Sequence, residues 1–497
     1  MSIQNRLEKK VYQLIIRRLD GEQIRSASYK KKIFEDIDRG IGGFILFGGE
    51  RDEIRTVLDE MQSAAEVPLF IASDVERGVG QQLRGCAAFP CQMAVSAGID
   101  RSNPGDVSLL EHGVMTIAEE VKDIGINMPL IPVLDVNQNP DNPIICTRAF
   151  SDNPRDVAWF GKKYTEILES AGLISCAKHF PGHGDTSSDS HILLPVISKS
   201  YDQLLAVDIL PFKEAVEAGA RSIMVGHLRI PSVDLKPASL SGKIITDILR
   251  SELGFDGLVL TDALNMNALQ DIKDVSAQCL QAGADILLHP ADPESAVREL
   301  MEGLASHKVT EELIDMALQR IMKAKKTFQK SVRRQIDYAH HKALSSLITE
   351  MSISLVRKSS GLLPIADRDA VHLIFAGDPE LFQASPLKNC YTSWSIATEG
   401  IEAEHDICIV AVFTNIAAWK GSSGINDDEK KRIQELMRQA RHSIVISFGS
   451  PYVLRHFSEA DVLIAAYEAT EQAQTAVVKC LEGLTDFKGR LPVEINI

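Results

Sequence analysis

Short apolar runs alternate with longer amphipathic stretches over the first two-thirds of the chain. Seven of these runs have the length of buried strands and lie at 40–48, 68–74, 126–136, 174–180, 222–228, 257–263 and 285–290. The stretches between them carry apolar residues at helical spacing, and this alternation is typical of parallel βα units. The pattern therefore predicts a parallel sheet whose consecutive strands are joined by helices.

Nearly every one of these runs is apolar where it starts and polar where it ends. The polar residues at the C-terminal ends are Asp74, Asp135, Lys178, His179, His227, Asp262 and His289. In a (β/α)8 barrel the carboxyl ends of all strands surround one mouth, where catalytic groups lie. We therefore expect an α/β protein with an N-terminal (β/α)8 TIM-like barrel over residues 1–330. The eighth strand is not evident, and a doubly wound open sheet fits the same pattern.

A helical, charge-rich stretch at 307–351 ends this pattern, and we expect a helical connector at 331–350. Beyond it, apolar runs at 371–377, 407–413, 443–449, 462–468 and 491–497 again alternate with helical segments. About five strands make a common sheet size. The sequence therefore predicts a second, smaller αβα sandwich domain over residues 351–497, as expected for a chain too long for one hydrophobic core.

Charge and cysteine usage narrow the class of partner. The formal net charge of −15 argues against nucleic acid, because binding to phosphates needs an excess of Lys and Arg. The eight cysteines are scattered singly, which is typical of reduced thiols in the cytoplasm. The N-terminal stretch mixes charge with apolar residues at helical spacing, so it predicts neither a secretory signal nor a membrane span. We expect a cytoplasmic protein with a small ligand.

The densest chemistry lies in the segment AKHFPGHGDTSSDSH at 177–191. Its imidazoles and carboxylates are permissible metal ligands, but their spacing matches no helical zinc motif, and Lys178 would repel a cation. A plain polar turn is a second interpretation. The third is proton transfer, because Asp189 can orient the imidazole of His191, and an imidazole titrates near neutral pH. The residues of this segment alone leave the three interpretations open.

Outside this segment, Asp262 ends an apolar run where its carboxylate can act as a nucleophile, and capping the following helix is an equally good interpretation. Asp135 and Asn137 are interpreted as turn formers, and His227 as a hydrogen-bonded histidine at a strand end. Arg148 lies between apolar residues, which favours a specific anion or hydroxyl partner.

Four stretches, taken in order along the chain, resemble the family 3 glycoside hydrolases, and within them the bacterial β-N-acetylglucosaminidases. They are INMPLIPVLDVNQNPDNPIICTRAF, KHFPGHGDTSSDSH, MVGHLRIPSVD and LVLTDALNM. The likeness covers most of residues 40–330. FGSPY at 448–452 and GRLPVEI at 489–495 resemble, more thinly, the sandwich domain that many members carry.

The resemblance implies a retaining double displacement without metal or cofactor. It makes Asp262 the nucleophile and His191, oriented by Asp189, the acid/base. It also implies that sugar hydroxyls are bound by Asp74, Arg148, Lys178 and His179. The loop is then a proton-handling arm. One departure is that the family pattern carries an arginine eight positions after the aspartate matched by Asp74, whereas this chain has Gln82 there and Arg84 two positions later.

We therefore expect exo-acting hydrolysis of terminal β-linked N-acetylglucosamine from a small carbohydrate or muropeptide-like cell-wall fragment. Two alternatives within the family are a β-glucosidase and a β-glycoside phosphorylase. An alternative of another class is a catalytically inactive sugar-binding or scaffold protein. The sequence does not indicate an oligomeric state.

Overall fold

The computed structural model describes residues 3–190, 192–328, 335–359, 361–398, 406–416 and 420–497. The chain forms two compact units, each assembled from separate stretches of sequence. The first unit comprises residues 1–88, 111–136 and 154–341, and the second comprises residues 89–110, 137–153 and 342–497. Within the described residues, no helix combines the length and apolarity that crossing a membrane requires.

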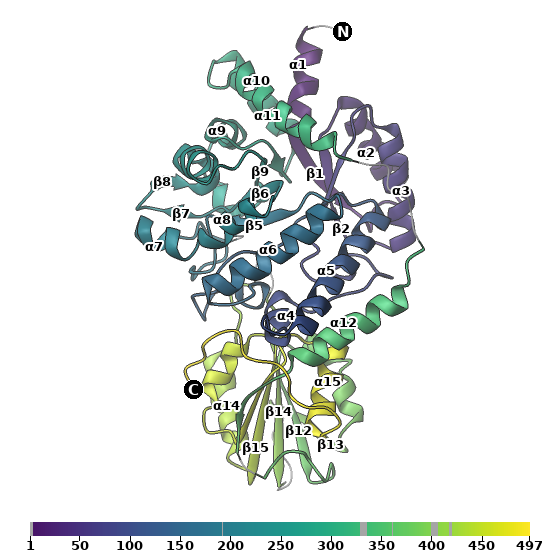
Figure 1. Cartoon of the computed structure of the whole chain (residues 1–497), viewed down its shortest axis with the longest axis vertical. Helices are drawn as coiled ribbons and strands as arrows, with labels where there is room; N and C mark the ends of the chain where they lie inside the picture. The colour runs from purple at the N-terminus through teal and green to yellow at the C-terminus, as the bar shows by residue number, and fades with distance from the viewer. Residues whose placement is uncertain (1–2, 191, 329–334, 360, 399–405, 417–419) are drawn as a thin grey trace. The chain divides into compact units, whose positions relative to one another are not determined.

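Eight short parallel strands form the centre of the first unit (Figure 1). They are β1 (Ile15–Asp20), β2 (Gly43–Phe47), β3 (Phe70–Ser73), β4 (Met128–Pro129), β5 (Cys176–Phe180), β6 (Ser222–Val225), β9 (Leu258–Thr261) and β10 (Leu287–Leu288). An antiparallel hairpin of β7 (Arg229–Ile230) and β8 (Asp234–Pro237) follows β6.

The strands close on themselves. One arc has the order β10-β1-β2-β3-β4 and the other the order β5-β6-β9. Parallel bridges join the arcs on both sides, from Val133 to Lys178 and from Leu260 to Ile286. Every strand therefore has a neighbour on each side, so the predicted (β/α)8 barrel is confirmed and the open sheet is excluded.

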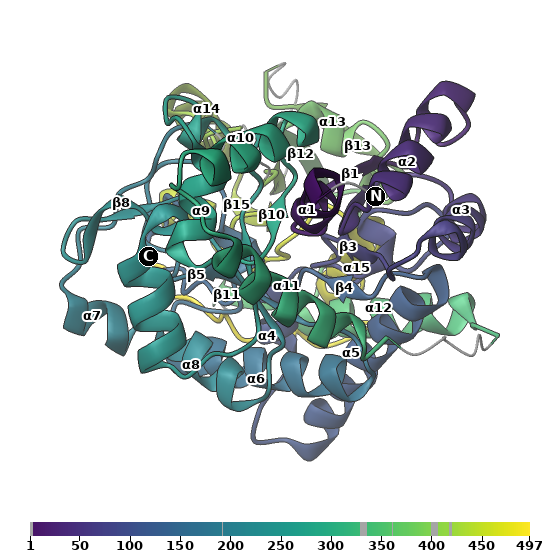
Figure 2. The ribbon, with the colours of Figure 1, turned by 90° about the horizontal axis from the view of Figure 1, so that it is seen from above.

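Helices surround these strands, as Figure 2 shows. They are α1 (Ile3–Tyr12), α2 (Ala27–Arg39), α3 (Arg51–Ala64), α5 (Pro104–Ile124), α6 (Pro154–Ser170), α7 (Tyr201–Ala206), α8 (Leu210–Glu217), η4 (Lys243–Glu252), α9 (Val275–Ala282), α10 (Pro293–Ala305) and α11 (Glu311–Lys325). Local signals set the ends of α2: the Ser26 side chain caps its first turn, and Gly40 ends it at a φ of 91°, where glycine is favoured.

The strand that the apolar pattern did not reveal is β1, with the sequence IIRRLD. Its two central arginines interrupt the apolar run. Arg17 is buried because it pairs with Asp36 of α2, which covers the outside of the barrel. Arg18 is exposed and, by the alternation of a strand, faces the opposite way. The strand therefore depends on tertiary contacts, such as the Arg17–Asp36 pair, that the apolar pattern does not show.

The second unit contains a six-stranded sheet of order β11-β16-β15-β14-β12-β13. The strands are β11 (Ser354–Lys358), β12 (Val371–Gly377), β13 (Ser393–Ile396), β14 (Ile407–Phe413), β15 (His442–Phe448) and β16 (Val462–Ala465). All neighbours are parallel except β11 and β16. The strand predicted at 491–497 is wrong: this segment forms no strand, and Val493 packs into the core instead.

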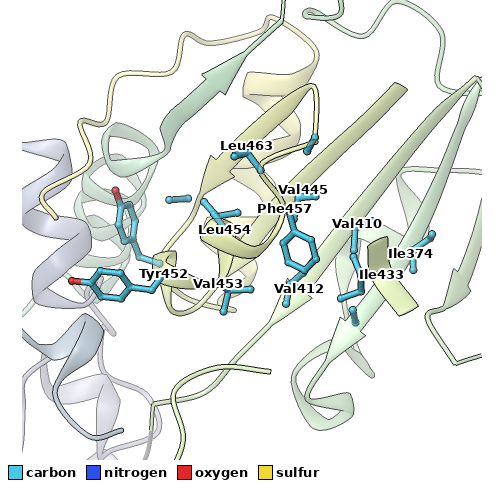
Figure 3. Packing of buried hydrophobic residues seen from close by; sticks show 14 of the residues in the cluster. Ile374, Val410, Val412, Ile433, Val445, Tyr452, Val453, Leu454, Phe457 and Leu463 are labelled. Carbon is cyan, nitrogen blue, oxygen red and sulfur yellow. The ribbon is translucent and has the colours of Figure 1, made fainter. Parts of the chain in front are cut away.

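Successive residues of the inner strands enter two separate cores. On β14, Val410 and Val412 join one cluster with Ile433 of α14 (Asp427–Met437), part of which Figure 3 shows. Ile409 and Phe413 join the other cluster, which includes residues of α15 (Glu471–Leu481). Helices therefore cover both faces, and the predicted αβα sandwich is confirmed. The described helices α4 (Gln92–Gly98), α12 (Tyr338–Ser352) and α13 (Pro379–Phe382) complete the set of α-helices.

Candidate active site

The candidate site lies at the carboxyl ends of the barrel strands in the first unit. Asp74 directly follows β3, Lys178 and His179 belong to β5, and Asp262 directly follows β9. Because the eight strands are parallel, their carboxyl ends share one mouth of the barrel. The fold thus brings together side chains that are far apart in the sequence.

Lys178 connects two carboxylates at this mouth. Its Nζ lies 2.7 Å from Oδ1 of Asp74 and 2.7 Å from Oε1 of Glu76. The lysine side chain is only 1% exposed, whereas that of Asp74 is 29% exposed. Asp74 is therefore the member of this cluster that presents most surface to a ligand, and Lys178 holds it in place and offsets its charge.

Asp135 organises the start of the segment after β5. Its Oδ2 lies 2.7 Å from Nδ1 of His179, and its Oδ1 accepts the backbone N–H of His183 at 2.6 Å. Burial opposes ionisation of this carboxyl, but the electrostatic interactions and hydrogen bonds with His179 and His183 outweigh it, so the pKa of Asp135 is lowered. The interpretation of Asp135 as a turn former is wrong: it is fully buried and binds two histidines.

Asp262 does not cap a helix. Its Oδ1 accepts the N–H of the next residue, Ala263, at 2.7 Å, and the following short helix η5 (Asn267–Leu269) begins only after Met266. The charges of Lys178, Asp74 and Asp262 all act on the thiol of Cys176, where burial raises the pKa to about 12. By the strand order, Asp74 follows β3, Lys178 lies on β5 and Asp262 follows β9, so all three belong to the same mouth of the barrel.

The segment after β5 is held at several points before it reaches Asp189. Gly184 packs so closely on the backbone of Val136 that a Cβ at this position would lie 1.8 Å from the Val136 carbonyl oxygen. Asp185 lies 3.4 Å from Nζ of Lys199, which also pairs at 2.7 Å with the buried Asp208. Side chains and backbone thus fix the first half of the segment to the barrel.

Burial lowers the pKa of His183 to about 4, although the charge of Asp135 opposes this shift. The imidazole is therefore neutral at pH 7, and its Nδ1 lies 2.9 Å from the hydroxyl of Thr186. Asp189 is 2% exposed, and its carbonyl accepts the N–H groups of Ile192 and Leu193. His191, the predicted acid/base, lies outside the described residues, so its pairing with Asp189 stays a prediction.

Arg148, a predicted sugar ligand, belongs to the second unit. It ends the short helix η2 (Cys146–Arg148), where its Nη1 donates to the carbonyl of Ile144 at 3.0 Å and its own carbonyl accepts Nε2 of Gln92 at 2.9 Å. Its role towards a sugar stays a prediction.

Gln82, which stands where the family pattern has an arginine, makes two hydrogen bonds with the backbone. Nε2 of Gln82 donates to the carbonyl of Asp74 at 2.9 Å, and its Oε1 accepts the N–H of Gly48. Arg84 does not take part in this network, because it pairs with Glu22 and Glu50, and its side chain is 58% exposed. Gln82 therefore fixes the backbone of Asp74, and Arg84 belongs to the outer rim.

Four residues of this mouth were absent from the predicted set of site residues: Glu76, Asp135, Arg18 and His289. Asp135 and His289 do end apolar runs, which is the signal that could have identified them. The sequence around Glu76 and around Arg18 carries no pattern that marks either as a site residue. The interpretation of His227 is confirmed: its ring nitrogens lie 2.8 Å from the hydroxyl of Ser239 and 3.2 Å from the carbonyl of Ala263.

In the part of the chain that the structure describes, no three His, Cys, Asp or Glu residues are grouped so that they could hold a metal ion. This part does not include His191, one of the residues that the metal interpretation invoked. Independence from metals therefore stays a prediction.

Residues 6–324 match the N-terminal domain of glycosyl hydrolase family 3. The chain is 29% identical to a β-hexosaminidase A of Pseudoalteromonas piscicida, over 92% of this chain and 89% of that protein. It is 25% identical to a β-N-acetylglucosaminidase/β-glucosidase of Cellulomonas fimi, over 91% and 88% of the two chains. The solved structure of a family 3 β-N-acetylglucosaminidase from Paenibacillus sp. str. FPU-7 matches with a TM-score of 0.83 and 26% identity, covering 100% of this chain and 99% of that one. The match to the family domain covers well over half of the chain, which therefore belongs to glycosyl hydrolase family 3 and is a glycoside hydrolase.

Proposed function

We propose that this enzyme removes terminal, non-reducing β-linked N-acetylglucosamine with retention of configuration. The observation that carries the proposal is that Asp262 and the Asp74–Lys178 pair lie at the carboxyl ends of parallel strands of one barrel. A nucleophilic carboxylate beside a group that binds sugar hydroxyls is what an exo-acting retaining glycosidase needs. The names of the similar proteins, β-hexosaminidase and β-N-acetylglucosaminidase, favour the N-acetyl sugar.

In the proposed reaction Asp262 attacks the anomeric carbon while His191 protonates the departing oxygen. The C–O bond to the aglycone breaks as the bond to the aspartate forms. His191, now neutral, then takes a proton from water, which attacks the same carbon and releases Asp262. The Ala263 N–H at 2.7 Å orients the attacking carboxylate, and we assign to Asp189 the orientation of His191.

We assign sugar binding to Asp74, Lys178, His179 and Arg148. Asp74 is half-buried and accepts hydrogen bonds from hydroxyl groups, and Lys178 fixes its position. The contact of His179 with Asp135 fixes the orientation of its ring. The proposed substrate is a small carbohydrate, a muropeptide-like cell-wall fragment in the cytoplasm, and no cofactor is needed for this chemistry.

The test follows an N-acetyl-β-glucosaminide and the matching β-glucoside by NMR, with and without phosphate. Two successive inversions give the β-anomer first, so initial α-product would contradict the mechanism. Faster turnover of the plain glucoside would make the enzyme a β-glucosidase. A β-sugar 1-phosphate as main product would make it a phosphorylase. Binding without turnover of either sugar would favour an inactive sugar-binding protein.

A further inference from the structure

A cationic side chain that no assigned role includes faces the barrel mouth from β1. Arg17 points outward to Asp36 of α2, so its neighbour Arg18 points to the inner side of the strand. The Arg18 side chain is 49% exposed. Its guanidinium carbon lies 4.8 Å from the centre of the Phe47 ring, at the end of β2.

The Phe47 ring also lies near a residue that follows β10, the strand that pairs with β1 on the side away from β2. Its ring centre lies 6.0 Å from that of His289, which follows β10. Burial and then the charge of Arg18 lower the pKa of His289 to about 4, while the charge of Asp74 opposes the shift. The charges of Arg18 and Asp74 therefore both act on His289, and its imidazole is neutral at pH 7.

The Arg18 guanidinium lies over the Phe47 ring, and its ion pair with Asp20 is long. The Asp20 carboxylate lies 3.7 Å away, which is beyond hydrogen-bond distance. Stacking over Phe47 fixes the plane of a group with five N–H donors. Gln82 is bonded to the Asp74 carbonyl, and Arg84 pairs with Glu22 and Glu50. Arg18 is thus an arginine on β1 whose partly exposed guanidinium can donate to a ligand in the mouth.

We propose that Arg18 is a substrate-binding residue that donates hydrogen bonds to hydroxyl oxygens of the terminal sugar whose protons Asp74 accepts. A hydroxyl is both donor and acceptor, so a carboxylate can accept its proton while a guanidinium donates to its oxygen. A sugar linked onward through such a hydroxyl could not be held in this way. The pair therefore makes the enzyme select an unsubstituted non-reducing end. This inference rests on the proposed function.

The experiment measures kcat/KM on an aryl N-acetyl-β-glucosaminide and on its 3-, 4- and 6-deoxy analogues. Arg18→Met keeps the packing over Phe47 and removes the donors, Arg18→Lys restores the charge, and Arg84→Ala is the control on the outer rim. We expect Arg18→Met to lose about 10- to 100-fold on the parent sugar, the loss of a charged hydrogen bond. The loss should be much smaller on at least one deoxy analogue, and Arg18→Lys should recover part of it.

Three outcomes overturn the inference. Arg18→Met within twofold of the wild type on the parent sugar removes the role of Arg18. An equal loss on the parent and on all deoxy analogues indicates general damage rather than a hydroxyl contact. Absence of turnover by the wild type removes the proposed function and this inference with it, whereas an active wild type with an unaffected Arg18→Met variant removes this inference alone.

Discussion

Nδ1 of His179 lies 2.7 Å from Oδ2 of Asp135, and both side chains are buried at the barrel mouth. The proton shared with the carboxylate is therefore the one on Nδ1, which fixes the tautomer of the imidazole. The same carboxylate holds the backbone of His183, so one residue sets both the ring of His179 and the path of the segment that leads to Asp189.

We expect Asp135→Asn to lower the free energy of unfolding by about 3 kcal/mol, because the substitution removes the carboxylate charge that pairs with buried partners. Asp141→Asn is the control, since Asp141 is exposed and pairs only at the surface with Arg455, and it should cost less than about 1 kcal/mol. Urea unfolding measures both values. A change below 1 kcal/mol for Asp135→Asn would show that the buried network is not held by this carboxylate.

Asp262→Asn should reduce turnover by several orders of magnitude and leave the melting temperature near that of the wild type. The amide cannot form the covalent intermediate, but it can still accept the Ala263 N–H. Rate assays and thermal melting on the two proteins decide this. Turnover within tenfold of the wild type would end the assignment of the nucleophile.

His191→Ala should affect substrates according to their leaving group. An activated aryl glycoside should show a burst of product followed by slow release, because its departing oxygen needs little protonation. An unactivated glycoside should lose turnover in the first step. Equal losses for the two substrates would argue against an acid/base.

Asp189→Ala should shift the pH–rate profile of His191 to lower pH, because a nearby carboxylate favours the imidazolium.

The half-buried, neutral imidazole of His289 should make the protein sensitive to acid. The pKa of His289 is about 4 in the folded chain and near 6.5 in an unfolded one, so the unfolded chain takes up its proton first as the pH falls. Stability is full above pH 6.5 and declines towards pH 4, and His289 contributes about 2 kcal/mol to the loss between pH 7 and pH 5.

His289→Asn should remove that part of the pH dependence. Asparagine tolerates the φ of 47° at this position. His307→Asn is the control, because His307 has a similar φ of 56° but is exposed. Unfolding free energies at pH 7 and pH 5 give the comparison. An unchanged pH dependence in His289→Asn would show that His289 is not the group responsible.

Most of the barrel could be predicted because parallel strands are buried on both faces and therefore have continuous apolar sequences. β1 could not, since the burial of Arg17 depends on Asp36 and the exposure of Arg18 depends on the barrel mouth. The site shows the same limit. Lys178 and Asp74 are 104 residues apart, and only the closed barrel makes them partners.

The second unit depends on two segments that precede its sheet by about two hundred residues or more. Within this unit, the Cys91 N–H reaches Glu468, Asn137 donates to the Tyr452 hydroxyl, and the Ser151 hydroxyl donates to the carbonyl of Pro492. A chain that ends at residue 341 lacks Glu468, Tyr452 and Pro492, the partners in these three hydrogen bonds. We expect it to aggregate, as judged by light scattering and by the absence of cooperative unfolding. A soluble truncated chain that unfolds cooperatively would contradict this.

The same division constrains how the protein can fold while it is being synthesised. Residues 89–110 and 137–153 leave the ribosome more than 300 residues before the C-terminal residues of their unit. At typical elongation rates this interval lasts about 20 to 70 s. Cys91, Met93 and Cys146, which end fully or almost fully buried, lack their later packing partners for that time. Chaperone binding to a nascent chain should therefore concentrate on these two segments.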